Sequence, residues 1–142
     1  MTAREALTGR VAVIAVAAVA LQAHADATSV EFPHGFADGI RYATVERGNI
    51  KEEIFTSRDT IDAVKQAGTV PVGTSITLVD YRDGQLFRYV VMEKRAEGWR
   101  YQPFNADRTA NLRDSPDRCA ACHQSQVHQD FVFTLDRMKS VR

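Results

Sequence analysis

The sequence predicts an α+β fold, in which an antiparallel sheet of about five strands is combined with one short crossover helix. Most of the chain beyond its first segment alternates apolar and polar residues with period two, and turn residues interrupt the alternation. Asp83-Gly84 separates two runs rich in β-branched and aromatic residues, which is a strong hairpin signal. The fold is therefore expected to be rich in β-structure.

The strands are expected in five segments that are joined by short turns. Gly48-Asn49 separates the first and second segments, and Asp83-Gly84 predicts a type I′ turn between the third and fourth segments. Short connections of this kind favour direct antiparallel pairing of most consecutive strands. The predicted strands are Arg41–Arg47, Ile50–Ser57, Ser75–Arg82, Gln85–Arg95 and Trp99–Phe104.

One stretch between the second and third strands has helical spacing instead. Apolar residues recur every three residues within Asp59–Ala67, Asp59 or Thr60 can cap its start, and Gly68 can end it. This predicts a short crossover helix. From Asn105 to Asp117 the residues are polar and include Pro116, which predicts an irregular loop before the C-terminal segment.

The N-terminal segment differs in composition from the rest of the chain. Arg4 and Arg10 precede the apolar run Val11–Leu21, which is followed by the small-x-small pattern Ala23-His24-Ala25. This order is typical of a secretory signal peptide, and the run is shorter than the ~20 residues that span a bilayer. We expect a signal peptide at residues 1–25, export to the periplasm and no stable membrane anchor.

The remaining residues, 26–142, are enough for one domain and too few for two ordinary ones. The 142-residue chain has 18 Lys and Arg against 18 Asp and Glu. Its formal charge is balanced, so it has no long-range field that would gather nucleic acid. We therefore expect a single exported domain that does not bind nucleic acid.

The two cysteines of the chain lie in the run Cys119-Ala120-Ala121-Cys122-His123. A C-x-x-C-H run is the attachment motif of a c-type haem, because thiols three residues apart can each reach one vinyl group. The adjacent imidazole is then directed at the iron. We expect one covalently attached haem c on Cys119 and Cys122, with His123 as the metal ligand.

Two other readings of these residues compete with haem attachment. A redox-active C-x-x-C pair belongs near the start of a βαβ unit, and no such unit is predicted here. Zinc could use Cys119, Cys122, His123 and His128, but adjacent ligands at 122 and 123 strain a tetrahedral site. Both interpretations are less well supported by the sequence than haem attachment.

The combination of a β-sheet with a C-terminal haem motif resembles the cytochrome P-460 and cytochrome c′-beta family. The resemblance runs over nearly the whole chain after the first segment, and the closing motif is its most specific part. The residues that carry it are Phe32–Phe36, Glu53–Phe55, the helix that ends at Gly68, Pro71–Thr74, Gly98–Phe104, Cys119–His123 and Asp130–Thr134.

The resemblance also bears on the reaction. Members that oxidise hydroxylamine carry a lysine joined to the porphyrin, five residues after the glycine that corresponds to Gly73, and this position is Leu78 here. Leu78 is expected to face inward with Ile76, yet a hydrocarbon cannot form that cross-link. The same register puts Glu52 where the cross-linked members carry an arginine. Both departures weigh against hydroxylamine oxidation.

Without the cross-link, the resemblance implies a haem whose open side is apolar and binds nitric oxide or a similar small gas. Glu52, Leu78 and Phe55 are the expected residues around this haem, although Glu52 could equally be a solvated strand residue. Aromatic candidates for the apolar wall, each also explicable as ordinary core packing, are Phe36, Phe55, Phe104, Phe131 and Phe133.

A sixth iron ligand is the main alternative to an open iron. Met92, Met138, His34 and His128 have side chains that could close the site. The leading function is gas binding, and the alternatives are oxidation of hydroxylamine or nitric oxide and simple electron transfer. The expected partners are a small gas and a redox protein, and an isologous homodimer is common for sheets of this kind.

Overall fold

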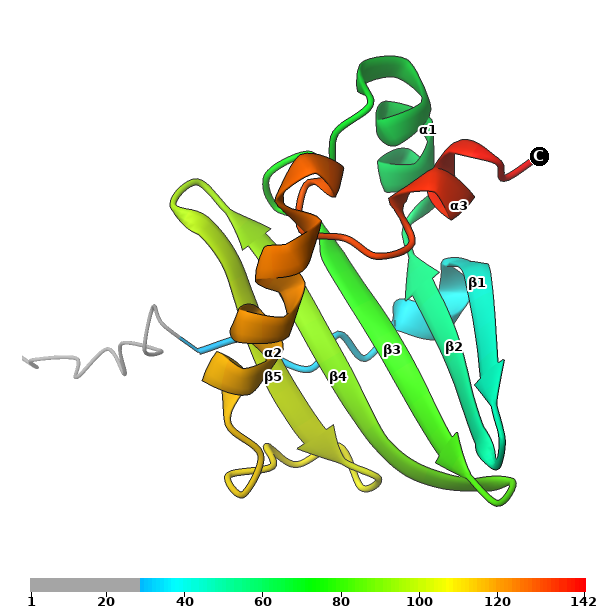
Figure 1. Cartoon of the computed structure of the whole chain (residues 1–142), viewed down its shortest axis with the longest axis vertical. Coiled ribbons are helices and arrows are strands. Elements are labelled where there is room, and N and C mark those ends of the chain that lie inside the picture. The colour runs from blue at the N-terminus through cyan, green and yellow to red at the C-terminus, as the bar shows by residue number, and fades with distance from the viewer. Residues whose placement is uncertain (1–28) are drawn as a thin grey trace, which may run out of the picture.

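A computed structural model describes residues 29–142 of the chain, and they form a single five-stranded antiparallel sheet in the order β1-β2-β3-β4-β5. Each strand is paired with its neighbour in the sequence, as Figure 1 shows. The α+β fold class and the five strands are therefore confirmed. The strands are β1 (Ile40–Arg47), β2 (Ile50–Thr56), β3 (Ser75–Arg82), β4 (Gln85–Arg95) and β5 (Gly98–Asn105).

The turn between β3 and β4 has the conformation that its sequence predicts. Asp83 and Gly84 have φ angles of 49° and 77°. Two consecutive positive φ values are the requirement of a type I′ turn, which matches the twist of the flanking strands. This turn helps to set a register in which Leu78 pairs with Val90 across the β3–β4 ladder and with Ile54 across the β2–β3 ladder.

The predicted crossover helix is present as α1 (Arg58–Ala67) and begins one residue earlier than expected. Ser57 is its N-cap, and the Ser57 hydroxyl accepts a hydrogen bond from the Thr60 amide at 3.1 Å. The expected caps, Asp59 and Thr60, lie inside the first turn instead. Gly68 ends the helix in the left-handed conformation at φ 77°, as predicted.

The C-terminal part is more helical than the sequence analysis predicted. The loop expected to extend to Asp117 ends earlier, because Ser115 caps α2 (Pro116–His123) and Pro116 occupies the first turn. Proline is well tolerated there, since its missing N–H has no partner within the helix. Two further short helices follow, η2 (Gln124–Gln129) and α3 (Leu135–Lys139), and η1 (Phe36–Asp38) precedes β1.

The sheet has two differently covered faces. In Figure 1, α2 crosses the near face over β4 and β5, α3 lies beside α1 at one end, and the segment before β1 runs behind the sheet. We call the near side the helical face and the far side the aromatic face. The core of the helical face contains Tyr42, Ile54, Ile61, Val64, Ile76, Met92, Tyr101, Val132, Leu135 and Met138, and that of the aromatic face contains Val30, Phe32, Val79, Tyr89, Val91 and Phe104.

The expected signal peptide at residues 1–25 lies outside the described residues, and its cleavage stays a prediction. Within residues 29–142 there is no helix of the length and apolar character that crossing a membrane requires.

Candidate haem site

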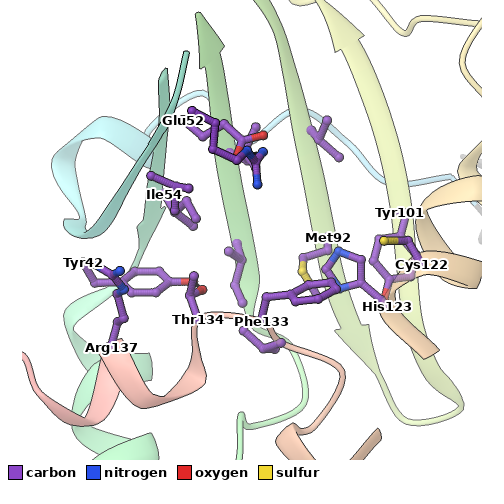
Figure 2. Close-up of a pocket in the computed structure, with 16 residues that line it drawn as sticks. Tyr42, Glu52, Ile54, Met92, Tyr101, Cys122, His123, Phe133, Thr134 and Arg137 are labelled. Carbon is purple, nitrogen blue, oxygen red and sulfur yellow. Dashed lines mark hydrogen bonds and ion pairs between the residues drawn. The ribbon is translucent and has the colours of Figure 1, made fainter. Parts of the chain in front are cut away.

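A cavity of ≈590 Å³ lies on the helical face, between the sheet and the C-terminal segments. Its volume is within the range of roughly 300–1,000 Å³ that is usual for ligand and cofactor pockets. In Figure 2, Cys122, His123 and Tyr101 lie at one end, and Tyr42, Ile54 and Arg137 lie at the other. The full lining is Tyr42, Val45, Arg47, Glu52, Ile54, Ile76, Leu78, Val90, Met92, Tyr101, Cys122, His123, Val132, Phe133, Thr134 and Arg137.

His123 is the last residue of α2, and its imidazole is oriented by a backbone carbonyl. Its Nδ1 lies 2.6 Å from the Phe131 carbonyl oxygen. A carbonyl oxygen can only accept, so the proton of the neutral ring is on Nδ1 and Nε2 keeps its lone pair. The rings of Tyr101 and Phe133 flank the imidazole with centroid distances of 5.0 Å each. The imidazole of His123 thus lies at the cavity wall in a fixed orientation, as a metal ligand would require.

Cys119 and Cys122 lie one helical turn apart on α2, so their side chains are on neighbouring parts of the same helix surface. Both are free thiols, and Cys122 lines the cavity. Cys119 is half-buried against the core of the helical face, and this burial raises the pKa of its thiol. The structure therefore brings Cys122 and His123 to the cavity and keeps Cys119 next to them on α2.

Leu78 and Glu52 both line the cavity. Leu78 faces it together with Ile76, two residues earlier on β3, so the inward orientation expected from alternation is present. The Glu52 carboxylate accepts a hydrogen bond from Arg47 at 2.8 Å, and 16% of its side chain is exposed. Glu52 is therefore neither fully solvated nor unpaired.

Phe55 does not reach the cavity. Residues of a strand alternate between its faces, so Phe55, three residues after Glu52, must lie on the opposite side of the sheet. Its ring packs edge to face against Phe36 at 5.2 Å on the aromatic face. The structure thus does not support Phe55 as a haem-binding residue, and the sequence analysis erred in grouping it with Glu52.

The other aromatic candidates divide in the same way. Phe36 and Phe104 belong to the packing of the aromatic face, where each ring contacts Phe32. Phe133 lines the cavity and is 52% exposed. Phe131 contacts His123 through its carbonyl oxygen, and it is not among the residues that line the cavity.

Of the four candidates for a sixth ligand, Met92 alone lines this cavity. It pairs across the β4–β5 ladder with Tyr101, whose ring contacts that of His123, so Met92 lies at the His123 end (Figure 2). Met138 is fully buried in the core of the helical face. His34 packs against Phe32 on the aromatic face, and His128 is exposed on η2.

Several cavity residues were not found by sequence reasoning. The Tyr42 and Thr134 hydroxyls are 2.9 Å apart, and burial raises the pKa of Tyr42 well above its usual range. Tyr101 is also buried, which raises its pKa to about 12. Period-two alternation along β1 does not predict that Tyr42 and Val45 share the cavity side, because a bulge between Arg41 and Ala43 shifts the register of the strand.

A zinc site is not supported by the geometry. Within residues 29–142, no three side chains of His, Cys, Asp or Glu come together as metal ligands.

The sequence also matches a known protein family. The sequence matches cytochrome P460 over residues 33–134, which is well over half of the chain. The chain belongs to the cytochrome P460 family. It is therefore a haem-binding cytochrome, and the resemblance noted from its sequence is confirmed. No curated protein matches this sequence.

The cavity of this cytochrome fits a haem by its chemistry as well as its volume. Ile54, Leu78 and Val90 supply the apolar walls that a macrocycle requires, and His123 supplies the nitrogen that iron requires. Cys119 and Cys122 are the residues that would attach its edge. When bound, the haem supplies an iron atom for ligand binding and electron exchange.

Proposed function

We propose that this cytochrome is an exported, periplasmic c-type protein that holds one haem covalently and binds nitric oxide or a similar small gas at an open iron position. The observation that carries the proposal is the hydrogen bond from His123 Nδ1 to the Phe131 carbonyl oxygen, 2.6 Å, at the wall of a largely apolar cavity. This bond prepares Nε2 of His123 as the single strong protein ligand.

Covalent attachment is supported by the positions of the two thiols. Cys119 and Cys122 are both free and lie on α2 immediately before His123. A C-x-x-C-H run on one helix holds the two anchors and the iron ligand in a constant spatial relation, as covalent haem attachment requires.

An open iron position is supported by the residues on the rest of the cavity wall. Met92 is at the His123 end, so it is poorly located for a ligand on the opposite side of the haem. The walls beyond it are largely hydrocarbon, including Ile54 and Leu78. A site of this kind suits a small uncharged gas.

Selection of nitric oxide over dioxygen is supported by the state of the polar groups that line the cavity. Arg47 donates to Glu52 at 2.8 Å, and the hydroxyls of Tyr42 and Thr134 pair with each other at 2.9 Å. In these two pairs the groups are engaged with each other, while Tyr101 and Arg137, which also line the cavity, lie at its two ends. Bound dioxygen needs a donor to stabilise its polar form, whereas nitric oxide binds ferrous haem without one.

The second candidate function, oxidation of hydroxylamine, is disfavoured by Leu78. The side chain at this position faces the cavity, where the cross-linked members of the family carry a lysine, and it has no amine. Simple electron transfer to a redox partner is the remaining alternative, and it requires a closed iron.

Titration of the reduced protein with nitric oxide tests the proposal. The Soret band should change at once and in proportion to the added gas, and dioxygen should oxidise the protein without forming a stable complex. A low-spin ferrous spectrum that nitric oxide alters only slowly would contradict the open site. Electron transfer would then replace gas binding as the function.

A further inference from the structure

We propose that Lys94, Trp99 and Asp130 form a clamp that positions His123 through the backbone of Phe131. The clamp thereby adjusts how much electron density His123 donates to the iron that it binds. We call these three residues the proximal clamp. The inference rests on the proposed role of His123 as the iron ligand. It assigns to the clamp a function beyond holding the C-terminal segment against the sheet.

The carboxylate of Asp130 is held by two parts of the chain that are distant in sequence. Lys94 Nζ on β4 lies 2.6 and 2.8 Å from its two oxygens, and the amide of Val70 donates to it at 2.8 Å. Lys94 also donates to the Val70 carbonyl at 2.7 Å. The Lys94 and Asp130 side chains are only 19% and 13% exposed, so water screens this pair less than a surface pair.

The backbone of Asp130 is held as well. The indole N–H of Trp99 on β5 donates to the Asp130 carbonyl at 2.9 Å. Trp99 and Lys94 are cross-strand partners, and the Lys94 ammonium lies 5.8 Å from the centre of the Trp99 ring. The adjacent strands β4 and β5 therefore hold both the side chain and the main chain of Asp130 in place.

The loop at this point has an unusual conformation. Asp130 and Phe131 have φ angles of 53° and 61°, and neither is glycine. Two consecutive left-handed residues with side chains persist only where the surrounding contacts require them. The contacts of Asp130 meet that requirement, and the result is that the Phe131 carbonyl is directed at His123 Nδ1.

The link to the iron follows from the chemistry of the imidazole. A short hydrogen bond at Nδ1 raises the basicity of Nε2, and partners behind a metal ligand tune the metal. A looser loop would lengthen the bond from Nδ1 to the Phe131 carbonyl. His123 would then donate less electron density, which favours ferrous over ferric iron.

The test compares clamp variants with a matched ion pair on the aromatic face. Asp130→Asn removes the charge but keeps the shape, Lys94→Met removes the cation, and Trp99→Phe removes the indole N–H alone. The controls are Glu53→Gln and Lys51→Met, because Glu53 is also buried, pairs with Lys51 at 2.7 Å and lies on the opposite face from His123.

The readouts are the iron–histidine stretching frequency of the ferrous protein, its reduction potential and its melting temperature. In the clamp variants the frequency should fall and the potential should become more positive. The control variants should lower the melting temperature without moving either spectroscopic quantity. Trp99→Phe keeps the ion pair, so it provides a test even if Asp130→Asn fails to fold.

Clamp variants that lower the melting temperature but leave both spectroscopic quantities unchanged would overturn the proposal, because the contacts would then be structural only. A wild-type preparation without haem would refute the proposed function separately. In that preparation, hydrogen exchange at the His123 ring N–H still tests whether the clamp positions His123. Faster exchange in Trp99→Phe than in Glu53→Gln would support this role, and equal exchange rates would refute it.

Discussion

The same five strands form both faces of the sheet, but the two faces carry different side chains and have different roles. On the aromatic face, Phe32 makes edge-to-face contacts with Phe36, Tyr89 and Phe104 at centroid distances of 5.1 to 5.9 Å. On the helical face, the same strands present shorter side chains such as Ile54 and Leu78 to a cavity of ≈590 Å³. One face is built around a packed cluster of rings, and the other lines the cavity that we propose for the haem.

The difference teaches where stability and function are located in this cytochrome. A close-packed face can stabilise the sheet on its own, because aromatic pairs add to the burial of apolar area. The helical face can then carry a cofactor cavity and a strained loop. We therefore expect substitutions on the aromatic face to change stability and substitutions at the cavity to change the haem.

The largest effect is expected for Phe32→Ala. Removal of a buried phenyl ring from the centre of the aromatic face should destabilise the protein by about 3–5 kcal/mol. The haem spectrum of the folded fraction should not change, since Phe32 is on the far side of the sheet from His123. Denaturant unfolding measures the first effect, and absorption spectroscopy measures the second. Leu112→Ala, at a side chain that is 91% exposed, is the control and should be nearly neutral.

The next effect is expected for Leu78→Lys, which places an amine in the cavity. Burial of the polar group should cost about 1–3 kcal/mol, and the haem spectrum should shift because position 78 faces the cavity. Leu78→Met is the matched control, since it keeps the volume and the apolar character. An unchanged spectrum in the lysine variant would mean that position 78 is not next to the haem.

A pH-dependent effect is expected from Tyr101. Burial raises its pKa from 10.0 to about 12, so the folded state favours the neutral phenol. The stability that this contributes is complete below pH 10.0 and is lost as the pH rises through about 12. Unfolding experiments across this range should show a decline that is smaller in Tyr101→Phe. An equal decline in both proteins would assign it to other groups.

The smallest effect is expected for Glu52→Gln at the cavity wall. Arg47 is 63% exposed, so breaking this ion pair should change stability by no more than about 1 kcal/mol. The variant also frees Arg47 as a donor at the cavity. Stopped-flow mixing with nitric oxide measures whether gas entry changes, and a large change in unfolding free energy would show that the pair is structural.

The sequence predicted the strands well because their signals are local. The period-two alternation and the Asp83-Gly84 turn indicate most of the pairing and most of the face assignments, and the exceptions lie at the bulges of β1 and of the β3–β4 ladder. The C-x-x-C-H run likewise singled out His123 as the expected iron ligand, which stays a prediction, and the structure adds the orientation of its ring through the Phe131 carbonyl.

The rest could not be predicted because it depends on contacts between distant residues. Asp130 meets Lys94 and Val70 only after the sheet has formed, and its left-handed backbone has no local signal such as glycine. The error at Phe55 had a different origin. Phe55 lies three residues after Glu52, and this odd spacing already places the two side chains on opposite faces of β2. The resemblance to a family motif outweighed that spacing.

The most direct test of the central claim is the resting optical spectrum of the purified protein, recorded before and after acid-organic extraction. The claim is that the helical face holds a covalent haem with His123 as its single protein ligand. We predict a high-spin spectrum without a far red-shifted Soret band, and haem that stays with the polypeptide after extraction. A low-spin spectrum, or haem that passes into the organic solvent, would contradict the account.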